Sequence, residues 1–165
     1  MIKLRYLITG FLGANNSSKI IVENIKSNNQ IDKLYLQNNF EICLQQLENK
    51  LKDQKVDRII SFGQKPVTRA FCIETVAYNK ETKIETGYNY LPLIKYLKDH
   101  NLSVRQSVRP GNYLCNYIYY HGLRLIRENN LETNMLIIHT PYSKNLTDVQ
   151  EVINTFSAYI FADMA

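Results

Sequence analysis

The stretch Val56-Asp57-Arg58-Ile59-Ile60-Ser61-Phe62 decides the fold class, because it is a short apolar run that ends at Gly63. Apolar runs of this length, bounded by turn residues, are typical of strands that are buried in a sheet. Further extended runs are spread along the chain, at residues 4–9, 33–36, 71–77, 102–108 and 135–139. The sequence therefore predicts a sheet whose strands come from the whole chain.

Segments with helical spacing separate these strands. Apolar residues recur every three or four positions in residues 40–51, which is the pattern of a helix with one buried face. Comparable segments predict a helix that ends at Ile25 and helices over residues 91–100, 113–128 and 145–161. We expect polar side chains to cap the first and last helices, namely Ser17 or Ser18, and Thr147 or Asn145. This alternation predicts an α/β fold: a single-domain three-layer α/β/α sandwich over residues 1–165, with a mostly parallel central sheet.

The composition is that of a folded domain. The 165 residues are 45% hydrophobic and 21% charged, close to the average for globular proteins, which argues against a disordered or collagen-like chain. Cys43, Cys72 and Cys115 lie outside any Cys-x-x-Cys spacing, so a zinc site and a disulfide framework are both disfavoured. Reduced thiols are typical of the cytosol. We therefore expect a cytoplasmic protein that binds no metal.

The net charge of +5 raises the question of a nucleic-acid partner. Lys50, Lys52, Lys55 and Arg58 lie among acidic residues, and no basic stretch carries interleaved aromatic residues. Because a nucleic-acid footprint gathers its cations on one face, we expect no nucleic-acid partner. No apolar run approaches the roughly 18 residues that a membrane span needs. The run that begins at Leu4 is interpreted as a first strand rather than as a signal peptide, so no membrane partner is expected.

Chemistry in such folds gathers where the parallel strands end. The segments predicted at this edge are Gly10-Phe11, Gly63-Gln64, residues 110–115 and His139-Thr140-Pro141. Cys115 follows a Pro-Gly turn and lies in the first turn of the helix predicted over residues 113–128. The helix dipole and the unpaired amides at that position would lower the pKa of a thiol and favour the thiolate. The alternative is a packed thiol that acts as a small apolar side chain.

A cysteine nucleophile needs a base within hydrogen-bond reach, and that base needs an orienting group. His139 suits the base by position, because it ends a predicted buried strand; a purely structural histidine is the alternative. Glu74 is an acidic residue within a largely apolar run, and a buried charge needs a partner. It suits the orienting carboxylate, and the alternative is a strand-edge side chain that faces water.

Three segments together resemble the motifs of pyroglutamyl peptidase I, also called pyrrolidone-carboxylate peptidase. The residues similar to the glutamate motif of that family are Gly63, Gln64, Pro66, Glu74, Val76, Ala77 and Asn79. Those similar to its cysteine motif are Ser107, Gly111 and Tyr113-Leu114-Cys115-Asn116. Those similar to its histidine motif are Ile137-Ile138-His139-Thr140-Pro141-Tyr142, and Thr9-Gly10-Phe11 resembles the end of its first strand. The order of the three motifs agrees with the family, and the resemblance covers nearly the whole chain.

This resemblance implies a phosphorylase/hydrolase-like fold and a cytoplasmic cysteine peptidase, or thiol protease, that removes an N-terminal pyroglutamyl residue from peptides. By motif position Cys115 would be the nucleophile, His139 the general base and then acid, and Glu74 the group that orients His139. The positions that match the lactam pocket of the family are Phe11, Gln64, Tyr113 and Leu114. The implied partners are peptides with an N-terminal pyroglutamate, without a cofactor or metal, and a homo-oligomer stays open.

The sequence departs from the family around this pocket. Residues 12–15 replace a Pro-Phe-Gly-Gly loop, so that a second pocket aromatic is absent, and Arg69 is at best a shifted substitute for the family's arginine after Gly-Gln. The segment between Asn79 and Leu91 is also shorter than in the family. Two alternatives therefore stay open: a divergent cysteine amidase or peptidase with a different N-terminal substrate, and a catalytically inactive homologue retained for binding or assembly.

Overall fold

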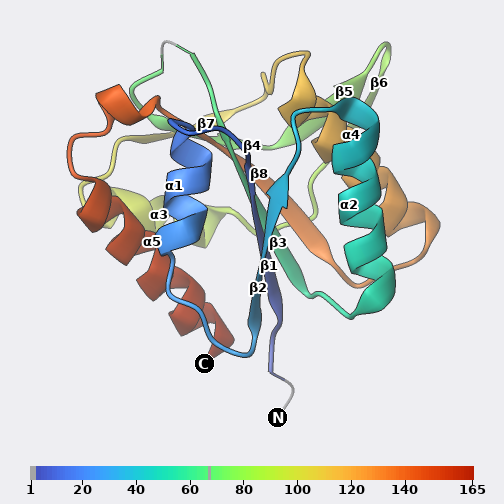
Figure 1. Ribbon diagram of the computed structural model, residues 1–165, viewed down its shortest axis with the longest axis horizontal. Coiled ribbons are helices and arrows are strands. Elements are labelled where there is room, and N and C mark those ends of the chain that lie inside the picture. The colour runs from blue at the N-terminus through green and yellow to red at the C-terminus, as the bar shows by residue number, and fades with distance from the viewer. Residues whose placement is uncertain (1–2, 67) are drawn as a thin grey trace.

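The computed structural model describes residues 3–66 and 68–165. A six-stranded sheet runs through its centre, with the strand order β2-β1-β3-β8-β4-β7 (Figure 1). Its strands are β1 (Tyr6–Phe11), β2 (Ile31–Leu36), β3 (Arg58–Gln64), β4 (Phe71–Glu74), β7 (Val104–Ser107) and β8 (Asn134–Thr140). Neighbouring strands are parallel except where β4 runs antiparallel to β8. The predicted sheet, mostly parallel, is therefore confirmed.

Helices cover both faces of this sheet (Figure 1). One side carries α1 (Ser17–Asn24), α3 (Leu91–Asp99) and α5 (Val149–Met164), and the other carries α2 (Phe40–Asp53) and α4 (Leu114–Glu128). This is the three-layer α/β/α sandwich that the sequence predicts. None of the helices in the described part of the chain is long and apolar enough to cross a membrane.

The central strands bury side chains on both faces. Ile60 and Phe62 of β3 belong to one core with Phe156 of α5, whereas Ile59 belongs to the other core with Leu47 of α2. Burying one such side chain contributes about 1.5–3 kcal/mol. A strand with helices on both sides therefore needs the continuous apolar run that the sequence carries there.

Residues 71–77, predicted as one extended run, contribute to two different sheets. β4 belongs to the central sheet, whereas β5 (Val76–Asn79) pairs with β6 (Thr82–Glu85) in a separate hairpin. Thr75 divides the two strands. Its amide donates a hydrogen bond to the carbonyl of Ser107 at the end of β7, and its carbonyl accepts one from the amide of Thr86, which follows β6. Lys80 makes the hairpin turn in the left-handed backbone conformation, with φ 54°. These partners are distant in sequence, so the apolar pattern alone does not reveal the break.

The helix caps differ from those predicted. Asn16 caps α1, since its side chain accepts a hydrogen bond from the amide of Ser18. Asp148 caps α5 and accepts from the amide of Glu151 at 3.0 Å. A short 3-10 turn at Ser143–Asn145 precedes it, so the last helix begins later than its sequence pattern indicates.

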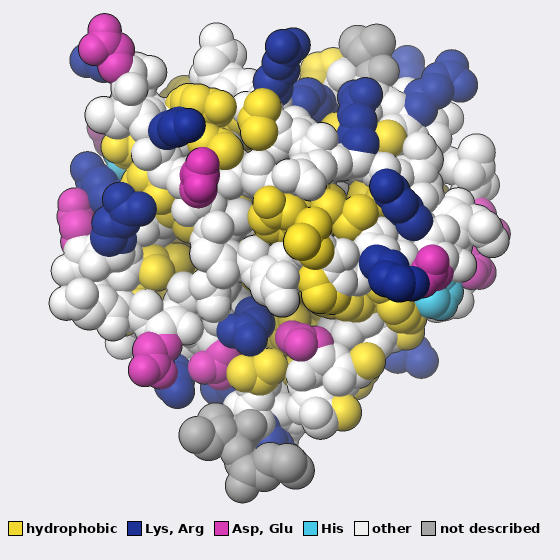
Figure 2. All heavy atoms as spheres, turned by 180° about the vertical axis from the view of Figure 1, so that it is seen from behind, with side chains coloured by type: hydrophobic (Ala, Val, Ile, Leu, Met, Phe, Trp, Pro, Cys, Tyr) yellow, Lys and Arg dark blue, Asp and Glu magenta, His cyan; other side chains and the backbone are white. Residues whose placement is uncertain are grey.

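The face seen in Figure 2 bears on the net positive charge. Acidic side chains lie beside the Lys and Arg side chains at the left and in the lower part of this view, whereas those at the upper right have neutral and hydrophobic neighbours. The positive charge on this face is therefore unevenly distributed.

We predict that Asp148→Ala lowers the free energy of unfolding by about 1 kcal/mol, because the first amides of α5 lose their cap. Thr147→Ala is the matched control, and we expect it to change the free energy of unfolding by less than about 0.5 kcal/mol. Urea denaturation followed by circular dichroism measures both variants. Equal losses would contradict the cap assigned to Asp148.

Candidate active site

A pocket of about 290 Å³ lies at the carboxyl ends of β1, β3 and β8, at the upper end of the sheet in Figure 1. Its lining residues are Phe11, Asn16, Asn38, Gln64, Pro66, Tyr113, Leu114, Cys115 and Tyr142. The structure therefore brings all four predicted pocket residues together around Cys115.

A larger hollow, of about 400 Å³, lies against α5 and is lined by Lys26, Asn154, Ser157, Ala158 and Phe161. These lining residues include no cysteine, histidine or carboxylate. Among residues 3–66 and 68–165, no three or more histidine, cysteine, aspartate or glutamate side chains are arranged to hold a metal ion. Chemistry therefore points to the smaller pocket beside Cys115.

Cys115 lies in the first turn of α4, as the sequence predicts. The helix begins at Leu114, and no side chain caps it, so its first amides remain available to a bound oxygen atom. Asn116 fixes this turn to β5 through a reciprocal contact with the backbone of Tyr78. Its Nδ2 donates to the carbonyl at 2.9 Å, and its Oδ1 accepts from the amide at 2.8 Å. The backbone beneath the thiol is thus held from both sides.

The Cys115 sulfur lies directly against β3. A Cβ atom at Gly63 would overlap this sulfur, so only glycine leaves it enough space. Gly63 pairs with His139 across β3 and β8, and paired positions present their side chains on the same face of a sheet. The sulfur and the imidazole therefore share one face of the sheet at neighbouring positions.

Glu74 and His139 form a buried pair. Nδ1 of His139 donates to Oε1 of Glu74 at 2.8 Å, and their side chains are 4% and 0% exposed. Glu74 pairs with Ile137 across antiparallel β4 and β8, so it is a diagonal neighbour of His139 on the same face. The alternative of a glutamate that faces water is therefore wrong. The contact with Glu74 uses Nδ1 and leaves Nε2 of His139, and within the described part of the chain no hydrogen bond joins Nε2 to the Cys115 thiol.

Burial alters the pKa values of this site. Burial works to raise the pKa of the Glu74 carboxyl, but the side chains of His139, Ser107 and Lys65 outweigh it, so that pKa lies below its ordinary value. Burial raises the pKa of the Cys115 thiol to about 12, and the negative charge of Glu74 adds to the rise. The expected lowering of the thiol pKa at a helix start is therefore wrong, because desolvation outweighs the helix amides. The thiol is neutral near pH 7 and needs a base.

Lys65 is a residue of this site that the sequence interpretation missed. Its Nζ lies 3.5 Å from Oε1 of Glu74 and donates to the carbonyl of Arg109 at 2.8 Å. Arg69, the substitute that the sequence suggests, is exposed. The cation beside Glu74 is thus Lys65, the residue directly after Gly63-Gln64. Its position at the end of a predicted strand was the feature of the sequence that could have indicated it.

No family model matches the sequence, but individual proteins do. The pyrrolidone-carboxylate peptidase of Thermosipho melanesiensis is 27% identical, over 86% of this chain and 85% of its own length. Pyrrolidone-carboxylate peptidase 1 of Caldanaerobacter subterraneus subsp. tengcongensis is 25% identical, over 84% of this chain and 83% of its own. Both alignments span most of each protein, so they compare whole domains.

Solved structures of proteins with these names have the same fold. Pyroglutamyl peptidase I from Bacillus amyloliquefaciens matches with a TM-score of 0.83 and 18% identity, over 94% of both chains. Pyrrolidone carboxyl peptidase from Thermococcus litoralis matches with a TM-score of 0.80 and 17% identity, over 98% of this chain and 96% of that one. At these identities the likeness establishes the fold.

Fold and pocket first define a class: an α/β protein that gathers a cysteine, a histidine and a glutamate at one edge of a mostly parallel sheet. The chain is similar to proteins of the pyroglutamyl peptidase I family, also called the pyrrolidone-carboxylate peptidase family, in sequence at 25–27% identity and in fold.

We predict that Gly63→Ala lowers the free energy of unfolding by about 1–3 kcal/mol, because the added methyl group overlaps the Cys115 sulfur. The same change should cost less in a Cys115→Ala background, where the nearest atom of residue 115 is its Cβ at 3.7 Å, an ordinary contact. Urea denaturation of the four proteins forms a double-mutant cycle. A loss at Gly63 that does not depend on the sulfur would contradict this close approach.

Iodoacetamide should modify Cys115 before Cys43 and Cys72, because only Cys115 is partly exposed. Since burial raises the pKa of its thiol to about 12, modification should be slow near pH 7 and its rate should still increase at about pH 10. Mass spectrometry of proteolytic peptides measures the rate at each cysteine. A rate at Cys115 that is already maximal at neutral pH would rule out the raised pKa.

Proposed function

We propose that this protein is a cysteine peptidase that removes an N-terminal pyroglutamyl residue from peptides. The observation that carries the proposal is the buried Glu74–His139 pair, on the sheet face that Cys115 also occupies. The names of the relatives support the same reaction, since they are pyrrolidone-carboxylate peptidases.

In the proposed reaction, Cys115 transfers its thiol proton to Nε2 of His139 as the sulfur attacks the pyroglutamyl carbonyl. Glu74 accepts the hydrogen bond from Nδ1 and stabilises the imidazolium that forms. Backbone amides in the first turn of α4 stabilise the oxyanion. The tetrahedral intermediate then breaks its C–N bond, and His139 protonates the departing amine. The product of this half-reaction is a pyroglutamyl thioester on Cys115.

Water completes the proposed cycle. His139 takes a proton from a water molecule as that water attacks the thioester. The second tetrahedral intermediate breaks its C–S bond, and the sulfur recovers a proton from the imidazolium. The products are free pyroglutamate and a peptide shortened by one residue. Protein side chains and water balance every proton in this cycle, so the proposal requires no cofactor.

The pocket suits a small neutral lactam. Phe11, which is almost fully buried, offers a ring on which the lactam can pack. The Gln64 side chain is engaged by the Ser17 amide at 3.1 Å, so we assign its polar contact with substrate largely to its backbone. Tyr113 and Leu114 complete the wall, which is largely apolar, as expected for a site that binds one small ring.

The free thiols of Cys43, Cys72 and Cys115 support a reducing compartment, so we propose that the reaction takes place in the cytoplasm. We further propose that residues 1–165 act as one catalytic domain, since the pocket draws on β1, β3, β8 and α4 together. The proposed partners are peptides that begin with pyroglutamate.

The test is hydrolysis of pyroglutamyl-aminomethylcoumarin by the purified protein under reducing conditions. The parent protein should release the fluorophore, and Cys115→Ala should reduce release to background, because the nucleophile is gone. Glu74→Gln should lower kcat/KM by about a hundredfold or more but retain activity above Cys115→Ala, because nucleophile and base remain.

Three outcomes separate the alternatives. Equal turnover by the parent and Cys115→Ala would contradict the mechanism. Release of another acyl group from a panel of aminoacyl-coumarins, without release of pyroglutamate, would favour the divergent amidase or peptidase. A folded parent protein that hydrolyses none of them would favour the binding homologue.

A further inference from the structure

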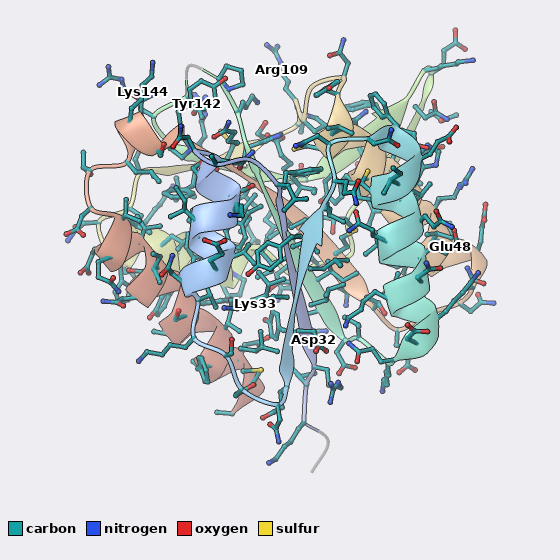
Figure 3. The ribbon with its side chains drawn as sticks, in the orientation of Figure 1. Asp32, Lys33, Glu48, Arg109, Tyr142 and Lys144 are labelled. Carbon is teal, nitrogen blue, oxygen red and sulfur yellow. The ribbon has the colours of Figure 1, made fainter. Side chains whose placement is uncertain are left out.

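Lys65 contacts Glu74 itself, the residue after His139, and the loop that leads to Cys115. Its backbone amide donates to the carbonyl of Thr140 at 2.9 Å, next to His139. Its Nζ lies 3.5 Å from Oε1 of Glu74, and it donates to the carbonyl of Arg109 at 2.8 Å. Arg109 lies in the loop that leads to α4 and Cys115, at the end of the molecule where Figure 3 also shows Tyr142 of the pocket.

The Glu74 carboxylate needs such a partner. It is completely buried, and its Oε2 has no hydrogen-bond partner among the described residues. The His139 ring supplies one donor to Oε1. A buried carboxylate with few donors is costly, and removal of the nearby Lys65 cation would leave more of its charge uncompensated.

Resting on the proposed function, we infer that Lys65 is a positioning residue: it keeps Glu74 charged against His139 and ties the 108–112 loop to the end of β3. The ammonium does not need to touch substrate for this role. It acts on the base through Glu74 and on the thiol through the loop that precedes Cys115.

Other charged and titratable groups also face Glu74, and they too influence its charge in an experiment that varies the pH. They are His139 of β8, Arg105 of β7, and Cys115 and Tyr119 of α4. Arg105 is engaged elsewhere, since its Nε donates to the Cys72 sulfur at 3.4 Å. Among the described residues, Lys65 is thus the one basic side chain of the lysine or arginine type that lies within ion-pair distance of Glu74.

The first experiment compares pH profiles of kcat/KM for pyroglutamyl-aminomethylcoumarin. Lys65→Met should lower kcat/KM by about tenfold, the usual effect of losing a hydrogen bond to a charged group. It should also move the acidic limb of the profile to higher pH, because the carboxylate loses a cation that favours its charged form. Lys65→Arg should restore both. Lys95→Met, which removes an exposed lysine on α3, should match the parent.

A structural role alone would give a different result. If Lys65 only held the 108–112 loop, activity would fall without a shift of the acidic limb. That outcome, or a Lys65→Arg variant as impaired as Lys65→Met, would overturn the inference.

A second experiment does not depend on activity, so it tests the role of Lys65 even where the proposed function is wrong. The pKa of Glu74 is lowered in the folded protein, so the stability it contributes is present above its unfolded pKa. That stability is lost as the pH falls through the folded pKa. The difference in urea midpoint between the parent and Lys65→Met should therefore be large at pH 7. It should shrink as the pH falls from the unfolded pKa of Glu74 through its folded pKa. A difference that stays constant with pH would overturn the coupling between Lys65 and Glu74.

Discussion

The hydrogen bond between Glu74 and His139 is the contact on which the rest of the site depends. A carboxylate without exposed surface costs several kcal/mol to bury unless donors and cations compensate it, and the imidazole is its direct donor at 2.8 Å. The reversal of β4 against β8 sets the register that brings the two side chains to one face. A register shift of one residue would turn Glu74 to the opposite core.

The thiol is held by a second constraint, the close approach of α4 to β3. Gly63 provides the space for the sulfur, and the Asn116 amide fixes the first turn of the helix to β5. The same approach buries the sulfur, which raises the pKa of the Cys115 thiol to about 12. The geometry that positions the thiol therefore also keeps it neutral, so the proposed attack by its sulfur needs the imidazole–carboxylate pair as a base.

Features that follow from local pattern could be predicted from the sequence, and features that depend on distant contacts could not. The layers of the fold, the position of Cys115 in a first helical turn and the place of His139 at a strand end all follow from short apolar runs and the residues that bound them. The break at Thr75 could not be predicted, because its partners lie at the end of β7 and after β6. The contact of Lys65 with Glu74 and the burial that raises the pKa of the Cys115 thiol likewise depend on residues distant in sequence, which local pattern does not place.

The long-range character of these contacts has a consequence for how the chain folds. Glu74 and His139 are 65 residues apart, and the buried hydroxyls of Ser17 and Thr140, bonded at 2.7 Å, are 123 residues apart. Contacts that close such long loops form late, after much of the chain has already ordered. Cys115 therefore comes to lie beside the Glu74–His139 pair only when β3, β8 and β4 have assembled, so a nascent or partly unfolded chain carries the thiol apart from the imidazole and the carboxylate.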